Sequence, residues 1–326
     1  MRSMWLMPCL LAWVGCGGAP PRECPLPTAE DERAAFLERL EAMRAAGSRV
    51  ELPEVDADAA RALAPPTASL RVRVSDHGVG LVEGLGMLSW SPERLDEELR
   101  SADPMRLGWL LSHDVEDVVS LDADRRIPAS ARQGGAQGFL VPALLEALSS
   151  RIHVRGAPPE LGLAIAPRTP FGTVAEVVYT AGQAGVERLE IVVRVDEAER
   201  AYPIVLPGFD ATELLEAPLA ELETPRFELY LALTAAGAVL AGSEGRLAPD
   251  CRSLADDDAP TLPGPLDLTA LGACLGRVKA DFPEEDTITI TADSEVPFEA
   301  VARAAVAAAG SAQGLFPRTL LSAGVR

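Results

Sequence analysis

The sequence is poor in positive charge and in aromatic residues. It holds 29 Lys and Arg against 49 Asp and Glu, so the formal net charge is −20, and Lys279 is its single lysine. Because it has no basic stripe, the sequence predicts no binding to nucleic acid and no adhesion to anionic lipid surfaces. Aromatic residues make up 5%, which is low for a protein that encloses a small ligand.

The sequence also lacks the residue spacings of catalytic and metal sites. Three scattered histidines and no close cysteine pair exclude the usual metal-ligand spacings. There is no Gly-x-Ser-x-Gly elbow, His-Glu-x-x-His helix, phosphate-binding loop or Rossmann glycine set. Asp293 and Glu295 offer two acid groups to a hydrolase, but alternation and a corner explain them better, and the Asp293 carboxylate is expected to accept backbone N–H bonds at the corner or helix start. We expect no catalytic residue, cofactor or metal ion, and we place His77 in a solvated turn.

No apolar run is long enough to cross a bilayer, but the N-terminus has the pattern of a signal peptide. Arg2 precedes an apolar run over residues 4–14 that has the length of a signal core. The run ends at Gly15-Cys16, which resembles the processing site of bacterial lipoproteins. This resemblance implies a signal peptide over residues 1–16 and a lipidated Cys16. The alternative is an ordinary secretory signal cut near Gly18-Ala19.

A lipidated cysteine implies an exported chain on the periplasmic side of the cell envelope, attached to the membrane by its lipid alone. Gly17 follows Cys16 where inner-membrane lipoproteins often have Asp, which favours the outer membrane. Residues 17–48 read as a Gly- and Pro-rich tether followed by a helix from Thr28 to about Ala46.

Export permits disulfide bonds, and four cysteines follow the apolar run. Cys251 and Cys274 lie in the second half of the chain and are either bridged or two buried reduced thiols. Cys24, close to the anchor, is left over.

One stretch of the sequence occurs twice, 127 positions apart. Each copy has alternating apolar residues, a polar break, Pro-Phe and then apolar residues at steps of three and four. The first copy spans 161–174 with Pro170-Phe171, and the second spans 288–301 with Pro297-Phe298. Each copy therefore predicts a strand, a tight corner and a helix that faces the core.

Other features repeat in the same order. A short strand closes with Leu52-Pro53 and again with Leu206-Pro207, and hairpin turns 159 positions apart carry Asp76-His77-Gly78 and Ala236-Gly237. Because proline donates no ladder hydrogen bond, the Leu-Pro strand is expected to be short or at a sheet edge. Residues 125–138 contain Gly134-Gly135, which predicts a mobile loop.

These repeats predict an α+β fold built from two tandem domains, each a mixed sheet with two helices packed on it. The domains are expected at 49–195, with an insert at 85–138, and at 202–326, joined by residues 196–202.

The ordered set of repeated features resembles the periplasmic domain of the ExbD/TolR family. The second copy carries the resemblance through residues 290–293 (Ile-Thr-Ala-Asp) and 296–298 (Val-Pro-Phe), whereas the first has Ala166 where the strand-end Asp is expected. The positions that carry it are Leu52, Pro53, Asp76, Gly78, Pro170, Phe171, Leu206, Pro207, Gly237, Asp293, Pro297 and Phe298.

Members of this family are inner-membrane partners of a proton-driven motor, with one transmembrane helix that bears an essential Asp. Their periplasmic domain dimerises, and it contacts peptidoglycan or an energy-transducing partner. With no such helix expected here, the resemblance implies a non-catalytic envelope lipoprotein of a biopolymer transport system. It would bind a protein by strand addition at the Leu-Pro edge or by dimerisation, or bind peptidoglycan. The alternatives are a periplasmic small-ligand-binding lipoprotein and an envelope hydrolase.

Overall fold

The computed structural model describes the following residues of the chain: 50–61, 63–68, 70–83, 116–135, 138–155, 160–206, 228–255, 259–309 and 315–322. The expected signal peptide, Cys16, the tether and the helix after Thr28 lie outside the described residues, as do Pro207 and most of the insert. In the part that is described, no helix is both long and apolar enough to cross a bilayer.

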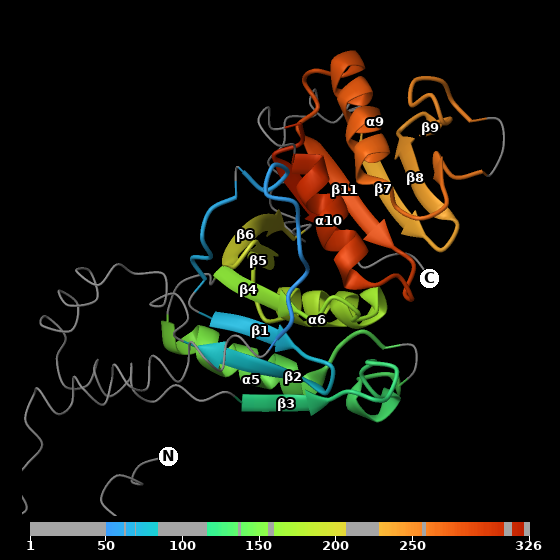
Figure 1. Ribbon diagram of the computed structural model, residues 1–326. Coiled ribbons are helices and arrows are strands. Elements are labelled where there is room, and N and C mark those ends of the chain that lie inside the picture. The colour runs from blue at the N-terminus through green and yellow to red at the C-terminus, as the bar shows by residue number, and fades with distance from the viewer. Residues whose placement is uncertain are drawn as a thin grey trace, which may run out of the picture. The chain divides into compact units, whose positions relative to one another are not determined.

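The described residues form a mixed α and β fold with one twelve-stranded mixed sheet (Figure 1). The strand order is β3-β2-β1-β4-β5-β6-β12-β11-β7-β8-β10, with β9 paired to β8. The first half provides β1 (Leu70–Val74), β2 (Gly78–Glu83), β3 (Glu116–Ser120), β4 (Glu160–Ile165) and β5 (Arg188–Val195). After β6 (Ala198–Val205), the second half provides β7 (Leu229–Thr234), β8 (Gly237–Gly242), β9 (Gly245–Arg246), β10 (Leu262–Pro263), β11 (Thr287–Ala292) and β12 (Arg318–Leu321).

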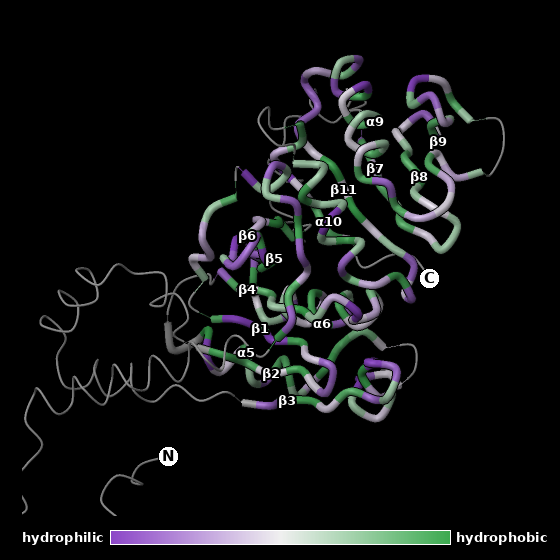
Figure 2. The backbone as a smooth tube through the Cα atoms, in the orientation of Figure 1, coloured by the Kyte–Doolittle hydropathy of each residue, from purple (hydrophilic) through white to green (hydrophobic). Residues whose placement is uncertain are grey.

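Four α-helices in the described residues pack on one face of this sheet: α5 (Pro142–Arg155), α6 (Phe171–Gln183), α9 (Leu268–Asp281) and α10 (Phe298–Ala309). A short 3-10 helix, η2, spans Ala129–Ala131. Alternate strand residues such as Val72, Leu163 and Ile290 join the helices in one buried core. Figure 2 shows hydrophobic segments along β2, β8 and β11. We call the sheet face opposite the helices the back face.

The two halves have the same strand order and the same strand directions. β1 pairs antiparallel with β2 and parallel with β4, and β4 pairs parallel with β5. In the second half β7 pairs antiparallel with β8 and parallel with β11, and β11 pairs parallel with β12. The register also repeats, since Leu70 lies opposite Leu161 and Leu229 lies opposite Ile288. These pairs preserve the offsets of 159 and 127 that relate the two copies in the sequence.

Strand β6 joins the halves into one sheet and corrects two sequence-based expectations. Residues 196–202 were expected to be a linker, but the chain turns back at Asp196, where φ is 53°, and β6 pairs with β5 along its whole length. The strand before Leu206 was expected to be short or at an edge, but β6 spans eight residues and lies between β5 and β12. On the side of β6 away from β5, the amide of Ala201 donates to Ala64 O, and Val205 pairs with Leu320 of β12. Pro203, which cannot donate a ladder hydrogen bond, lies between these two contacts and breaks neither of them.

The first Leu-Pro segment is not a strand. It crosses the back face, where Leu52 and Val50 are buried against Ala166 and Val192. Pairing is limited to one bridge between Glu54 and Arg194. The segment around Leu52-Pro53 therefore packs on the back face of the sheet and does not add a strand to it.

The insert also holds structure that the sequence did not reveal. β3 pairs with β2 at the end of the sheet. Residues 125–135 of the loop that was expected to be mobile pack on the fold: Ile127 is buried, and Arg132 forms an ion pair with Glu176 at 3.2 Å (Nε to Oε2). The two residues of this pair are themselves largely buried, which anchors the loop to α6.

A disulfide bond joins Cys251 and Cys274, whose Cα atoms are 5.4 Å apart. It ties the loop after β9 to the buried face of α9. Closing a loop of this length restricts the unfolded chain and stabilises the fold by roughly 3 kcal/mol in the chain-entropy model.

Candidate functional site

The two Pro-Phe corners, which are far apart in sequence, bond to each other. Pro170 and Pro297 form an antiparallel bridge. The amide of Phe171 donates to Val296 O at 2.9 Å, and the amide of Phe298 donates to Thr169 O at 2.8 Å. A second pair runs from Gly172 N to Ser294 O and from Glu299 N to Pro167 O, both at 2.9 Å. In each pair of hydrogen bonds the two donor residues are 127 positions apart, and so are the two acceptor residues. The contact is therefore two-fold and self-complementary, like the interface of a symmetric dimer.

This arrangement satisfies the first turns of α6 and α10. The first amides of a helix lack partners within the helix, and proline has no side chain that can accept from them. Pro170 makes no side-chain cap, and the acceptors come instead from the corner of the other half. Close approach is helped by Gly172, because a Cβ at this position would lie 3.1 Å from Cβ of Ser294.

Polar side chains of the first half surround this joint. Asp76 at the β1–β2 turn pairs with Arg125, and Arg126 pairs with Glu295 of the second corner. The hydroxyl of Thr173 donates to the carbonyl of Arg125 at 2.9 Å. The hairpin, the loop before η2, α6 and the second corner therefore meet at one place.

The two hairpin glycines have the same task in each half. A Cβ on Gly78 would lie 2.9 Å from Val119 O of β3, and a Cβ on Gly237 would lie 2.1 Å from Leu262 O of β10. Both positions must therefore be free of a side chain so that the outer strand can pair.

Several expected site residues do not form a reactive group. Asp293 was expected to cap the corner with its carboxylate, but its backbone does so: its amide donates to Leu233 O and its carbonyl accepts from the Val296 amide. Glu295 is held by Arg126, and His77 is exposed at the hairpin turn. Within the described residues, no group of three or more His, Cys, Asp or Glu side chains is placed to hold a metal ion.

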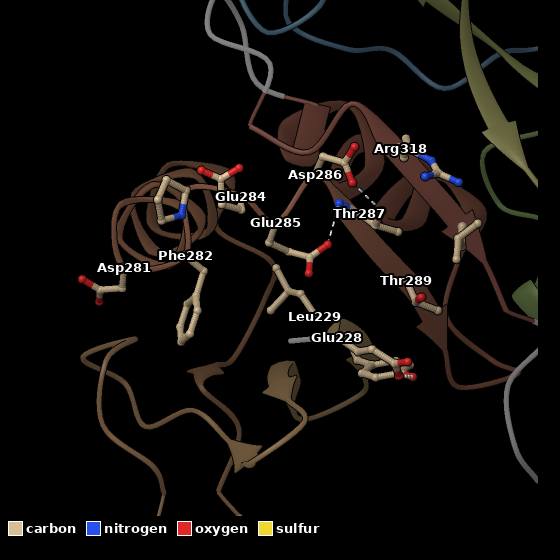
Figure 3. A pocket seen from close by; sticks show the side chains of 13 residues that line it. Glu228, Leu229, Asp281, Phe282, Glu284, Glu285, Asp286, Thr287, Thr289 and Arg318 are labelled. Carbon is tan, nitrogen blue, oxygen red and sulfur yellow. Dashed lines mark hydrogen bonds between the residues drawn. The ribbon is translucent and has the colours of Figure 1, made fainter. Parts of the chain in front are cut away.

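The second half carries a groove of about 750 Å³ that the sequence did not reveal. It opens where β7, β11 and β12 begin and where α9 ends (Figure 3). Leu229, Tyr230 and Leu320 provide apolar surface, and Tyr230 and Phe282 are each 39% exposed. Five carboxylates and one guanidinium also line it: Glu228, Asp281, Glu284, Glu285, Asp286 and Arg318. We call this surface the acidic groove.

Part of the acidic groove is held rigidly. Glu285 accepts from the amide of Thr287 at 2.9 Å, and Lys279 donates to the carbonyl of Glu285, so the turn after α9 is pinned to β11. Tyr230 donates its hydroxyl to Glu228. That hydrogen bond is the main cause of a raised pKa of Tyr230, and burial adds to it. Figure 3 shows Arg318 at one end of the groove and Phe282 at the other.

The residues of the groove come from four elements, which explains why the sequence did not indicate it. The one local signal is the run of acids after Phe282-Pro283 that links α9 to β11. Comparison of this chain with protein-family models, with curated proteins and with solved structures finds no match. Kinship with the ExbD/TolR family therefore stays a prediction.

Proposed function

We propose that this chain is a non-catalytic lipoprotein of the bacterial cell envelope that carries two ExbD/TolR-like modules. Its role is to bind a protein partner beside a proton-driven biopolymer transport system. The observation that carries this proposal is the two-fold bonding of the Pro-Phe corners. The family's periplasmic domain acts as a dimer, and a single chain with two mutually bonded copies is the covalent counterpart of that arrangement.

The edge of β3 that has no partner strand among the described residues favours strand addition as the binding mode. Among the described residues β3 pairs with β2 alone, and Ser120, opposite Gly78, is exposed. A groove of about 490 Å³ lies beside this strand, lined by Val118, Pro128 and Pro142 among others. An added strand would find backbone partners on β3 and a surface for its alternate side chains in this groove. The net negative charge favours a protein partner over the anionic cell wall.

Site-specific photo-crosslinking in the native bacterium tests the partner. A photoreactive residue at Ser120 should give adducts that contain a subunit of the proton-driven motor or its transducing protein. The same residue at Arg303, which is exposed on α10, is the matched control and should give none. Equal labelling from both positions, or no adduct with such a protein, would contradict the proposal.

Labelling with a fatty-acid probe tests the anchor. The native chain should take up the probe and sediment with membranes, and a Cys16→Ala variant should do neither. A variant that still partitions with membranes would show that the attachment does not depend on Cys16.

A further inference from the structure

We propose that the acidic groove binds an extended, basic segment of a partner polypeptide. This inference deepens the proposed function, because it names a second surface and the chemistry of its ligand. It follows from a comparison of the groove with the equivalent surface of the first half, which is already covered by an extended piece of chain.

The strand register defines the equivalent positions. Tyr230 on β7 corresponds to Arg71 on β1, and Thr289 on β11 corresponds to Gly162 on β4. Leu320 on β12 corresponds to Glu190 on β5, because Leu161 lies opposite Leu189 and Ile288 lies opposite Thr319. The floor of the acidic groove is therefore the same part of the repeated sheet as the surface around Arg71, Gly162 and Glu190.

In the first half that surface carries residues 63–68, which we call the strap. The amides of Thr67 and Ala68 donate to one carboxylate oxygen of Glu190 at 3.0 and 2.9 Å. Ala68 lies over Gly162, where an added Cβ would be 3.5 Å from that of Ala68. The strap contains Pro65-Pro66, and a residue that precedes proline is held in an extended conformation. An extended chain held by a carboxylate is thus already seen on one copy of this surface.

The second copy presents the same frame with different side chains. Arg71 is 5% exposed in the first half, whereas Tyr230 at the matching position is 39% exposed. The volume of about 750 Å³ lies within the range of well-formed ligand sites. Tyr230 and Phe282 provide aromatic faces on which the apolar stems and the cationic ends of Arg and Lys side chains pack favourably.

Charge selects the kind of segment. The five carboxylates and one guanidinium of the lining carry a net charge of −4, and Arg252, which pairs with Asp281 at 3.8 Å (Nε to Oδ2), reduces it to −3. Within a Debye length of about 8 Å at physiological ionic strength, these charges attract a basic segment and repel an acidic one. Arg318, at the end of the groove, would donate hydrogen bonds to a backbone carbonyl or to a carboxylate of such a segment.

Fluorescence anisotropy with the purified full-length protein tests the proposal. The probe is a labelled heptapeptide of alternating Arg and Leu, and a peptide of alternating Glu and Leu is its counterpart. The basic peptide should bind, and its affinity should fall as salt is raised. Glu284→Arg, which reverses an exposed charge of the groove, should weaken binding about five- to tenfold. Tyr230→Ala should weaken binding by a similar factor.

Glu244→Arg is the matched control, because Glu244 is exposed in the β8–β9 turn outside the groove and the charge change is the same. It should change the affinity less than twofold, since only distant screened charge is altered. Equal losses from Glu284→Arg and Glu244→Arg would overturn the proposal, as would equal binding of the acidic peptide.

The chain's own residues before Glu228 are a rival occupant. If the basic peptide binds only to an Arg226→Glu, Phe227→Ala double variant, the groove belongs to the chain itself and the proposal of a partner is overturned. None of these results depends on lipidation or on crosslinking at Ser120. Failure of this inference is therefore distinguishable from failure of the proposed function.

Discussion

The two halves share a frame but differ in how they use their back faces. Strand order, directions and register are the same in both, and so are the bonds of the Pro-Phe corners. On the back face, however, the first half is covered by residues 50–61 and 63–68, and Arg71 is buried, whereas no segment among the described residues covers the acidic groove of the second half, where Tyr230 is exposed. Positions that build the core and the joint are thus repeated, and positions on the outer face have diverged. This contrast supports the proposal that the second half binds a ligand.

The largest expected effect comes from the two corner phenylalanines, which are equivalent and buried at 1% and 0% exposure. Phe171→Ala and Phe298→Ala should each lower the free energy of unfolding by about 3–5 kcal/mol, through lost burial and the cavity left behind. Because both lie in one core, each variant should unfold in urea as one cooperative transition. Two separate transitions would show that the halves are independent domains.

The disulfide bond sharpens the comparison because it belongs to the second half. A Cys251→Ser, Cys274→Ser double variant should lose roughly 3 kcal/mol of stability, since the unfolded chain regains the freedom of the closed loop. Urea unfolding with and without reductant measures this. In reductant, the urea midpoint of the native protein should fall to that of the variant. An unchanged midpoint would contradict a stabilising effect of the disulfide bond.

High pH probes the junction between the halves. Burial between β6 and β12 raises the pKa of Tyr202 to about 12, and the hydrogen bond with Thr319 lowers it in part. An unfolded tyrosine ionises near pH 10, so the unfolded state loses its proton first, and stability falls as the pH rises from about 10 to 12, by up to about 3 kcal/mol. Tyr202→Phe should remove this part of the pH dependence. If Tyr202→Phe still shows the full loss of stability between about pH 10 and 12, ionisation of Tyr202 is not its cause.

The smallest effect separates the two equivalent outer positions. Arg71 is buried and donates to Glu199 at 2.8 Å, so Arg71→Ala should cost about 1–3 kcal/mol through the lost charged hydrogen bond and packing. Tyr230→Ala should cost less than about 1 kcal/mol, because that side chain is partly exposed. Thermal unfolding of both variants gives the difference. Equal losses would mean that the second back face is as covered as the first.

Much of the frame could be predicted from the sequence, because it depends on local patterns. The hairpin around Asp76-His77-Gly78 and the helices after each Pro-Phe are found where periodicity and turn residues predicted them. The matching offsets of 127 and 159 predicted which strands correspond.

The sequence could not show how the halves meet. The interior position of β6 depends on pairing with β5 on one side and with Ala64 and Leu320 on the other, which no local pattern encodes. β3 is a short strand without clear alternation, and the groove is assembled from residues some ninety positions apart, from Glu228 to Arg318. Asp293 was assigned a side-chain role that its backbone performs.

The most direct test of the paired corners is a cross-link between them. Cβ of Ser294 lies 3.1 Å from the place of a Cβ on Gly172, which is a few tenths of an ångström closer than the Cβ–Cβ separation of about 3.5–4.5 Å in disulfide bonds, so a small shift of the corners allows the bond. A Gly172→Cys, Ser294→Cys variant should oxidise within one chain, and peptide mapping by mass spectrometry should find the two cysteines joined. If the variant folds and both new cysteines remain free thiols under oxidising conditions, the two corners do not meet, and the account of a single-chain pair is contradicted.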